Sequence, residues 1–209
     1  MSLKSSKWSG KLVIAAAAVM LSVITTGCIL DPGKQYEEGN RYLYGRDGYR
    51  VNYEKAAEWF IKSAEQGHSG SMYQLGYCYE TGKGFAQNDI TAFDWFMKSA
   101  SLQYTEAEYK VGWCYDYGKG IRKNSAEAAK WYKKAAEAGN HNAQYQLGLR
   151  YEYGKDVNLN KEEALKWYEK AADQGNKEAM FKAGNCYELG IGTEKNASRA
   201  AGYYKRAGR

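Results

Sequence analysis

A repeat with a period of 36 residues constrains the fold of this chain more than any other feature. Four tryptophans recur at that spacing and a tyrosine continues the series: Trp59, Trp95, Trp131, Trp167 and Tyr203. Three more columns keep the same register: Gly76, Gly112, Gly148 and Gly184; Tyr79, Tyr115, Tyr151 and Tyr187; Asn52, Asn88, Asn124, Asn160 and Asn196. Self-similarity at such a period is typical of solenoids, in which each repeat is one supersecondary unit.

Each copy predicts a helix, a turn and a second helix, as residues 107–142 illustrate. Val111 and Cys114 belong to an apolar face with helical spacing, which indicates the first helix. Gly118 ends that helix, because glycine readily adopts the left-handed conformation at a helix C-terminus. Asn124 is the expected N-cap of the second helix, with Glu127 placed as in a capping box. The fold class predicted is therefore all-α.

The second helix has an apolar face of its own, made of Ala128, Trp131, Tyr132, Ala135 and Ala136. We expect the tryptophan column to be core, because large aromatic side chains fill the space that small residues leave between helices. A column of cations follows three residues after it and is expected to be solvated: Lys62, Lys98, Lys134, Lys170 and Arg206.

Three departures from the pattern are visible. The first copy has one extra residue near Asp47. Asp156 replaces the second turn glycine in the fourth copy, and aspartate tolerates the left-handed region better than most residues. Gln103 stands where Gly67, Gly139 and Gly175 stand in other copies, so the second-to-third junction is expected to bend differently.

The repeat resembles the Sel1-like repeat. The resemblance rests on the run Ala107-x-Tyr109-x-Val111-Gly112-x-x-Tyr115-x-x-Gly118-x-Gly120, followed by Ala128-x-x-Trp131-Tyr132-x-Lys134-Ala135-Ala136-x-x-Gly139. It implies a right-handed α-solenoid of about five helix-turn-helix repeats, related to tetratricopeptide repeats. Members of that family commonly act as adaptors between proteins. Some are bacterial envelope lipoproteins, some neutralise lipase toxins as immunity proteins, and a few are described as β-lactamase-like.

The first 27 residues read as an export signal rather than as part of the array. A leader with three lysines precedes Leu12–Ile24, an uncharged run that is too short to span a bilayer and suits a secretory signal. The residues before Cys28 resemble the lipobox of bacterial lipoproteins, which implies lipidation of Cys28, although Thr25 stands where that family prefers leucine. An ordinary cleaved signal or an uncleaved anchor is the alternative.

The chain is therefore divided into a signal peptide over 1–27, a short tether over 28–33 and a repeat array over 34–209. The predicted repeats are 34–70, 71–106, 107–142, 143–178 and 179–209.

The chain offers few residues for chemistry. Its two histidines, His68 and His141, stand apart from any cluster with metal-ligand spacing, and no serine begins a Ser-x-x-Lys motif. Cys78, Cys114 and Cys186 share one repeat position and are expected to be buried thiols, because packed helices hold equivalent positions too far apart for disulfides. We therefore predict no catalytic residue, no metal site and no cofactor.

The net charge also excludes one class of partner. The chain carries +6, of which the leader supplies three, leaving +3 from residue 28 onward. So mild an excess gives little support for nucleic-acid binding, which usually shows a concentrated basic face.

The first helices are expected to line the concave side of the solenoid and to bind a partner there. Three of their positions, spaced four and three apart, share one stripe. The predicted partner-binding residues are Tyr73, Tyr77, Glu80, Tyr109, Trp113, Asp116, Tyr145, Glu152, Phe181 and Glu188, with Leu149 and Asn185 at the remaining places. A packing role for the tyrosines and a solvated role for the acids is the alternative.

The function predicted is a non-enzymatic scaffold or adaptor that binds another protein of unknown identity. It is expected to be exported and held at a membrane by an N-terminal lipid, facing the periplasm or the cell surface. An immunity protein that neutralises a secreted toxin, and a module that binds carbohydrate or peptidoglycan on the aromatic and acidic stripe, are the alternatives.

Overall fold

The computed structural model describes residues 30–208, which form ten α-helices and, within that range, no strand. The first helices of the five repeats are α2 (Pro32–Tyr44), α4 (Ser69–Thr81), α6 (Thr105–Tyr117), α8 (His141–Tyr153) and α10 (Lys177–Leu189). The second helices are α3 (Tyr53–Glu65), α5 (Asp89–Ser101), α7 (Ser125–Glu137), α9 (Lys161–Asp173) and α11 (Ala197–Ala207). The predicted all-α solenoid of five helical hairpins is confirmed.

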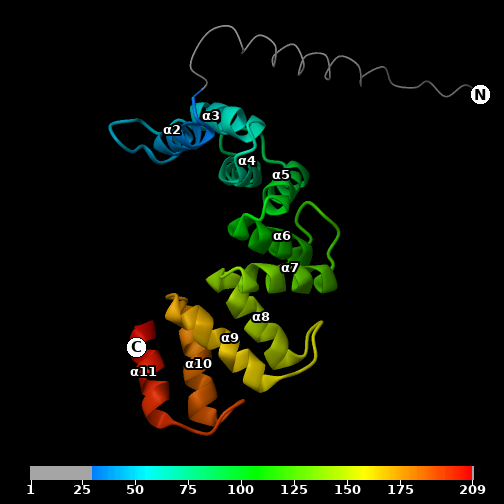
Figure 1. The fold of residues 1–209 in the computed structure, drawn as a ribbon, viewed down its shortest axis with the longest axis vertical. Coiled ribbons are helices and arrows are strands. Elements are labelled where there is room, and N and C mark those ends of the chain that lie inside the picture. The colour runs from blue at the N-terminus through cyan, green and yellow to red at the C-terminus, as the bar shows by residue number, and fades with distance from the viewer. Residues whose placement is uncertain (1–29, 209) are drawn as a thin grey trace, which may run out of the picture.

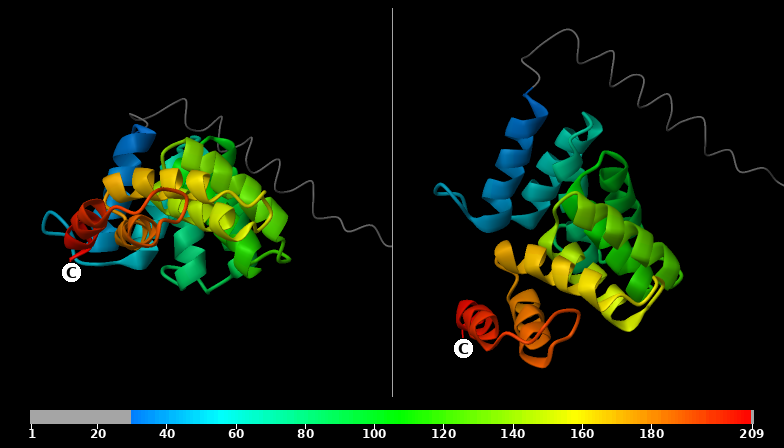
Figure 2. Two further views of the ribbon diagram at one scale, coloured as in Figure 1. Left: turned by 90° about the horizontal axis from the view of Figure 1, so that it is seen from below. Right: turned by 60° about the horizontal axis from the view of Figure 1, so that its bottom comes forward.

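The hairpins follow one another along a curved array (Figures 1 and 2). Each second helix packs against the first helix of its own repeat, and α3, α5, α7 and α9 also pack against the first helix of the next. In Figure 1 the array bends so that α2 and α11 lie on the same side, with the middle repeats displaced to the other side. None of the described helices has the length and apolar character that a membrane span requires.

The array begins slightly earlier than the sequence predicts. Helix α2 starts at Pro32, two residues before the predicted boundary, because the Asp31 side chain accepts hydrogen bonds from the free backbone N–H groups of the first turn. The predicted signal over 1–27 and the lipidation residue Cys28 lie outside the described residues.

The asparagine column caps the second helices. In all five repeats the side chain of the residue before the helix accepts a hydrogen bond from the backbone N–H three residues on: Asn52, Asn88, Asn124, Asn160 and Asn196. The predicted cap at Asn124 is thus confirmed. The carboxylate of Glu127, expected to complete a capping box, instead pairs with Lys130 at 2.6 Å.

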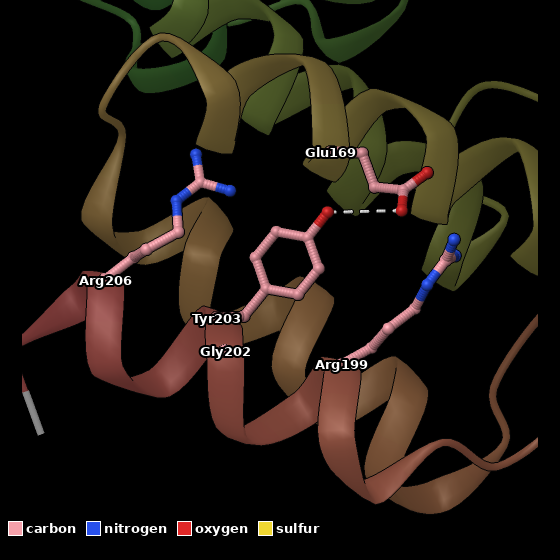
Figure 3. A pocket seen from close by; sticks show the side chains of 5 residues that line it. All are labelled: Glu169, Arg199, Gly202, Tyr203 and Arg206. Carbon is pink, nitrogen blue, oxygen red and sulfur yellow. Dashed lines mark hydrogen bonds between the residues drawn. The ribbon is translucent and has the colours of Figure 1, made fainter.

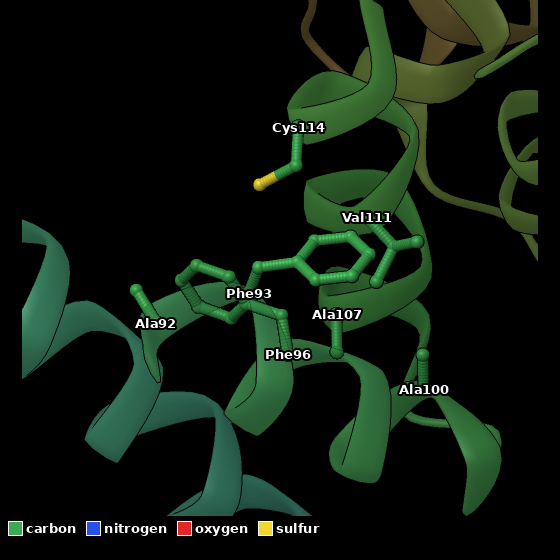
Figure 4. Close-up of a cluster of buried hydrophobic side chains, with 7 residues drawn as sticks. All are labelled: Ala92, Phe93, Phe96, Ala100, Ala107, Val111 and Cys114. Atoms are coloured by element: carbon green, nitrogen blue, oxygen red, sulfur yellow. The ribbon is translucent and has the colours of Figure 1, made fainter. Parts of the chain in front are cut away.

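The core is built around the residue that follows each tryptophan. The side chains at this position are Phe60, Phe96, Tyr132, Tyr168 and Tyr204, and the first four are fully buried. A Cβ added at Gly76 would lie 2.5 Å from the Phe96 ring. Glycine at this position therefore allows the ring of the second helix to pack directly against the backbone of the first helix. Figure 4 shows Phe96 packed with Val111 and Cys114, which belong to the next repeat.

The tryptophan column is less buried than predicted. Only Trp167 is buried, at 8% exposure, whereas Trp59, Trp95 and Trp131 are half-buried at the junction with neighbouring repeats. The cation column is exposed to solvent, as expected, and also lies over these indoles, with ammonium-to-ring distances of 4.6, 4.1, 5.1 and 4.0 Å for Lys62, Lys98, Lys134 and Lys170. The lower burial of the tryptophans follows from helix geometry, since adjacent positions point about 100° apart and cannot both face the first helix of their own repeat.

The glycine turns adopt the expected left-handed conformation, and so do the two residues that replace glycine. Gly118 has φ +71° and Asp156 has φ +60°, in agreement with the prediction for that aspartate. Gln103 also has φ +60° and makes the same turn hydrogen bond, to Ala100, that Gly139 makes to Ala136. The expectation of a different bend at this junction is therefore wrong, and the backbone accepts local strain to keep the repeat geometry.

Replacing Gln103 with glycine is expected to stabilise the chain by about 1 kcal/mol, because a left-handed conformation costs a non-glycine residue roughly that much. Urea denaturation followed by circular dichroism measures the effect. Glycine has more freedom in the unfolded chain, which offsets part of the gain. A destabilised Gln103→Gly variant would show that the exposed glutamine side chain contributes more than its strained backbone costs.

The three cysteines are buried free thiols, as predicted. Burial raises the pKa of the Cys114 thiol to about 12 and the pKa of the Cys78 thiol to about 11. These thiols are protonated at neutral pH and pack as small apolar side chains.

Candidate functional site

The aromatic column of the predicted stripe serves packing. Tyr73 lies 5.6 Å from Phe96 between ring centroids, and Tyr109 lies 5.8 Å from Tyr132. Tyr145 and Phe181 make the equivalent contacts with Tyr168 and Tyr204, both at 6.0 Å. Each ring therefore leans on the core ring of its own repeat and is half-buried. Burial also raises the pKa of Tyr73 to about 12, so its hydroxyl stays protonated.

The acidic stripe is largely neutralised from inside the molecule. Lys110 of α6 reaches back to Glu80 of α4, with a closest approach of 2.8 Å. Two periods further along, the same pairing joins consecutive repeats, since Lys182 of α10 bonds Glu152 of α8 at 2.9 Å. Both pairs are largely shielded from solvent and join the first helices of consecutive repeats. The sequence predicts that these carboxylates are available to a partner protein. In the structure they instead form ion pairs within the chain.

The second member of the stripe, Asp116, has a side chain that is only 12% exposed and contacts two cations, Arg150 at 2.9 Å and Lys155 at 3.2 Å. The fourth member differs. Glu188 is exposed and accepts a hydrogen bond of 2.7 Å from the Tyr204 hydroxyl. The four acids thus share a sequence position but not an environment.

Arg150 occupies the cysteine position of the fourth repeat and is 3% exposed. It bonds Asp116 of the preceding repeat and Asp156 of its own turn, the latter at 2.8 Å. The Ser125 hydroxyl donates to the same oxygen of the Asp156 carboxylate at 2.6 Å. Arg150 and Asp156 are both departures from the repeat pattern, and the structure shows that they are partners.

The close approach of the turns explains why these departures occur together. In three other repeats the second turn glycine lies against the carbonyl oxygen of the first residue of the preceding second helix. A Cβ added there would come within 2.5 Å of that oxygen at Gly84, 2.0 Å at Gly120 and 2.2 Å at Gly192. In the fourth repeat that helix begins at Ser125, which instead bonds the Asp156 carboxylate. The hydrogen bond between Ser125 and Asp156 replaces the close backbone contact that glycine makes in the other repeats. Arg150 compensates the negative charge of the Asp156 carboxylate.

The hydroxyls of the core tyrosines have different partners. The Tyr168 hydroxyl donates to Glu152, whereas the Tyr132 hydroxyl is buried without a hydrogen bond. Burial raises the pKa of Glu152, but the hydrogen bonds from Tyr168 and Lys182 outweigh it, and the net pKa lies below the ordinary 4.5. Glu152 therefore contributes stability above its unfolded-state pKa, which is lost as the pH falls through the lower folded-state value.

Tyr168→Phe is expected to lower the free energy of unfolding by about 1.5–3 kcal/mol, because it removes a hydrogen bond to a charged group. Tyr132→Phe is the matched control. It removes an unpaired buried hydroxyl from a position where Phe60 and Phe96 stand in other repeats, so it is expected to be neutral or to stabilise by about 1 kcal/mol. Urea denaturation of both variants gives the comparison, and equal losses would contradict the assignment.

The exposed aromatic side chains lie next to the predicted stripe, at a position that the sequence reasoning missed. The last residues of the first helices are Tyr44, Tyr117 and Tyr153, exposed at 50, 61 and 65%, and Leu189 at 59%. The signal was present in the sequence, because Tyr117 stands four residues after Trp113 and recurs with the period. We define the rim as these helix ends with the turns that follow them: 44–52, 81–88, 117–124, 153–160 and 189–196.

Two predicted residues, Tyr77 and Trp113, border the rim and remain partly exposed. The Trp113 ring lies 5.0 Å from that of Tyr117. Consecutive repeats are also connected here, since Lys182 donates to the Tyr153 hydroxyl at 3.1 Å. The rim segment of the fourth repeat is therefore linked to the first helix of the fifth repeat. That the first helices line the concave side of the array stays a prediction.

A separate hollow of about 330 Å³ lies between α9 and α11 (Figure 3). Its polar side chains bond one another or nearby groups, with Tyr203 on Glu169 at 3.2 Å, Arg199 on the Tyr187 hydroxyl and Arg206 on Asp173. It contains none of the predicted partner-binding residues. Over residues 30–208, no group of histidine, cysteine and acidic side chains is placed to hold a metal ion.

Comparisons with known proteins agree with the architecture. The Sel1 repeat family matches five consecutive segments, 35–68, 69–104, 105–140, 141–176 and 177–209. A solved Sel1 repeat protein from Oxalobacter formigenes is 32% identical, with a TM-score of 0.78, over 94% of this chain and 78% of its own. Comparison with curated protein sequences finds no match.

Two other solved structures are similar. A protective antigen present in uropathogenic Escherichia coli strains, with an SLR fold, is 28% identical with a TM-score of 0.78; the match covers 84% of this chain but only 38% of the antigen. An immunity protein from Pseudomonas aeruginosa is 24% identical with a TM-score of 0.57, over 89% of this chain and 67% of its own, a likeness of fold alone. The matched repeats span the whole helical array, and the chain belongs to the Sel1 repeat family.

Proposed function

We propose that this chain is a non-enzymatic adaptor of the bacterial cell envelope that binds another protein through the rim. Sel1 repeat proteins are generally protein-interaction scaffolds on a non-catalytic fold. The observation that carries the proposal is the row of exposed rings at one repeat position, Tyr44, Tyr117 and Tyr153. Single exposed apolar side chains are ordinary, but a row in register offers the large anchors that dominate protein interfaces.

The location in the envelope rests on the N-terminal sequence. Its basic leader, apolar run and Cys28 support export followed by lipidation. Helix α2 begins at Pro32, so only a few residues separate Cys28 from the folded array. A lipid on Cys28 would therefore hold the first repeat within roughly 15 Å of the membrane surface, the reach of four extended residues.

The two alternative functions receive less support. The likeness to an immunity protein extends to the fold alone. For carbohydrate binding, the predicted stripe would need free carboxylates beside its rings, and Glu80, Asp116 and Glu152 are bound to cations of the following repeat. The adaptor proposal needs neither the likeness to an immunity protein nor free carboxylates in the stripe.

The test of the adaptor function is capture of a partner from the native envelope after cross-linking of the full chain. Tyr117→Ser with Tyr153→Ser is expected to abolish capture, because it removes the exposed anchors without opening the core. The control is Leu102→Ser, which removes another large exposed apolar side chain, 50% exposed, from a turn between repeats. Capture that survives loss of both tyrosines would exclude the rim.

The lipid anchor has its own test. Mass spectrometry of the mature N-terminus is expected to show acylated Cys28, and Cys28→Ala is expected to release the protein from membranes. A mature chain that starts elsewhere and carries no lipid would remove the anchor from the proposal while leaving the rim function unaffected.

A further inference from the structure

We infer that the segment bound by the rim is acidic and carries apolar side chains. The inference rests on the proposed function, because it names the chemistry of the partner that the same surface takes. It is the reverse of what the acidic stripe predicts from the sequence alone.

Positive charge is concentrated in the rim. It contains eight basic residues and three acidic ones. The basic residues are Arg46, Arg50, Lys83, Lys119, Arg122, Lys123, Lys155 and Lys195, and the acidic residues are Asp47, Asp156 and Glu194. The four turns on the opposite edge, which join one repeat to the next, contain no charged residue: 66–68, 102–104, 138–140 and 174–176. The rim excess exceeds the net charge of the chain from residue 28 onward, which is +3.

The acidic residues of the rim are mostly occupied. Asp47 bonds Arg41 at 3.0 Å, and Asp156 bonds the buried Arg150 at 2.8 Å. Both of these cations lie inside the first helices, outside the rim. Two rim cations are paired with carboxylates outside the rim, Lys119 with Asp89 at 3.6 Å and Lys155 with Asp116 at 3.2 Å. Within the described residues the other six rim cations form no ion pair, so the rim stays positive.

A favourable interaction with the helix dipole explains part of this pattern. In four of the five repeats a cation just after the first helix faces the partial negative charge of the helix C-terminus, as Lys83 and Lys119 do. The dipole does not explain Arg122 and Lys123, which stand at the end of the same turn, directly before the capping residue Asn124. Nor does it explain why the neighbouring tyrosines are left in solvent.

The cations and the rings form mixed sites. The Arg46 guanidinium lies 4.7 Å from the centre of the Tyr44 ring, and the Lys83 ammonium lies 5.1 Å from that of Tyr77. Within the described part of the chain, neither Arg46 nor Lys83 forms an ion pair. A carboxylate from a partner can bind such a cation while an apolar side chain packs on the adjacent ring.

A basic partner fits this surface poorly. The stripe acids that would attract it already contact Lys110, Arg150 and Lys182, and these pairs are mostly buried. A basic segment would meet the exposed rim cations first, and like charges slow association. An acidic segment would be steered toward the same surface.

The mixed character of the rim favours a protein segment over other anions. Each repeat offers one to three cations beside, in most repeats, one exposed aromatic or leucine side chain. A polypeptide can alternate carboxylates with apolar groups to match it. A nucleic acid or an anionic bilayer presents a uniform row or sheet of phosphates, which matches a concentrated basic face instead.

The test is selection of binders to the full chain, in detergent, from a displayed library of random 15-residue peptides. Retained peptides are expected to be rich in aspartate or glutamate together with aromatic or aliphatic residues. Their affinity is expected to fall about ten-fold or more in the triple variant Lys83→Gln, Lys119→Gln, Lys123→Gln, with most of the loss in the association rate at low salt. The matched control Lys133→Gln, Lys177→Gln, Lys205→Gln removes equal charge outside the rim and is expected to change affinity less than about two-fold.

Other outcomes overturn the inference in distinguishable ways. Basic or neutral peptides that bind and are lost in Tyr117→Ser with Tyr153→Ser would leave the adaptor function standing and reverse the partner chemistry. An absence of enriched peptides would overturn the acidic segment, while capture from the envelope decides the adaptor function separately. Phosphatidylglycerol vesicles or single-stranded DNA that bind more tightly than every peptide, and depend on the three lysines, would assign the rim to a phosphate-rich ligand.

Discussion

Replacement of Arg150 by alanine is expected to lower the free energy of unfolding by about 3–5 kcal/mol, the usual cost of removing one member of a buried ion pair. The guanidinium is 3% exposed and bonds Asp116 and Asp156, so its loss leaves two shielded carboxylates facing the gap. Lys155 compensates only one of them, at 3.2 Å from Asp116. Urea denaturation monitored by circular dichroism measures the loss.

The control for this prediction uses the residues that other repeats carry. Arg150→Cys with Asp156→Gly restores the cysteine and glycine of the other copies, and Asp156→Gly also relieves a left-handed φ of +60°. We expect the double variant to lose less stability than the sum of the single changes, since the two side chains are in contact. Additive losses would show that Arg150 and Asp156 do not act as a pair.

Tyr132→Ala is expected to cost about 3–5 kcal/mol, the range observed when a large aromatic side chain is removed from a core. Tyr132 has 0% exposure and its ring lies directly against Gly112, where an added Cβ would come within 2.9 Å of it. Thermal and urea denaturation of the full chain both report the change.

Trp131→Ala is the matched comparison, because it removes a larger ring from the adjacent position. Trp131 is half-buried and one of its faces is covered by Lys134 at 5.1 Å. We expect a smaller loss than for Tyr132→Ala, since less apolar surface returns to water. If Trp131→Ala proves the more damaging change, the junction between repeats contributes more than the core within each repeat.

The sequence by itself determined the architecture, because the same capping residues, turn glycines and apolar positions recur in each repeat. Asn124 and its equivalents cap the second helices as predicted, and the turn glycines adopt the left-handed conformation that their side-chain-free backbone permits. Short-range rules were sufficient for these features. They were also sufficient for the buried thiols, since Cys114 stands on an apolar face with helical spacing.

The sequence did not determine which of two neighbouring aromatic columns forms the core. Trp131 and Tyr132 are adjacent, both are large, and both recur with the period. Hydrophobicity favours the tryptophan, but the angle at which the second helix meets the glycine of the first helix selects Tyr132. That angle is a property of the packed pair.

Only the tertiary structure decided the chemistry of the binding surface. Four carboxylates in register indicate an acidic stripe as long as the chain is read one repeat at a time. The cations that pair with three of them come from the following repeat, as Lys110 does for Glu80 and Lys182 for Glu152, about 30 residues away in these two cases. Coulombic attraction depends on distance in space and on burial, and neither is encoded in the position of a residue within its own repeat. Stacking of the repeats therefore neutralised the acids and left the rings and cations of the rim exposed to solvent.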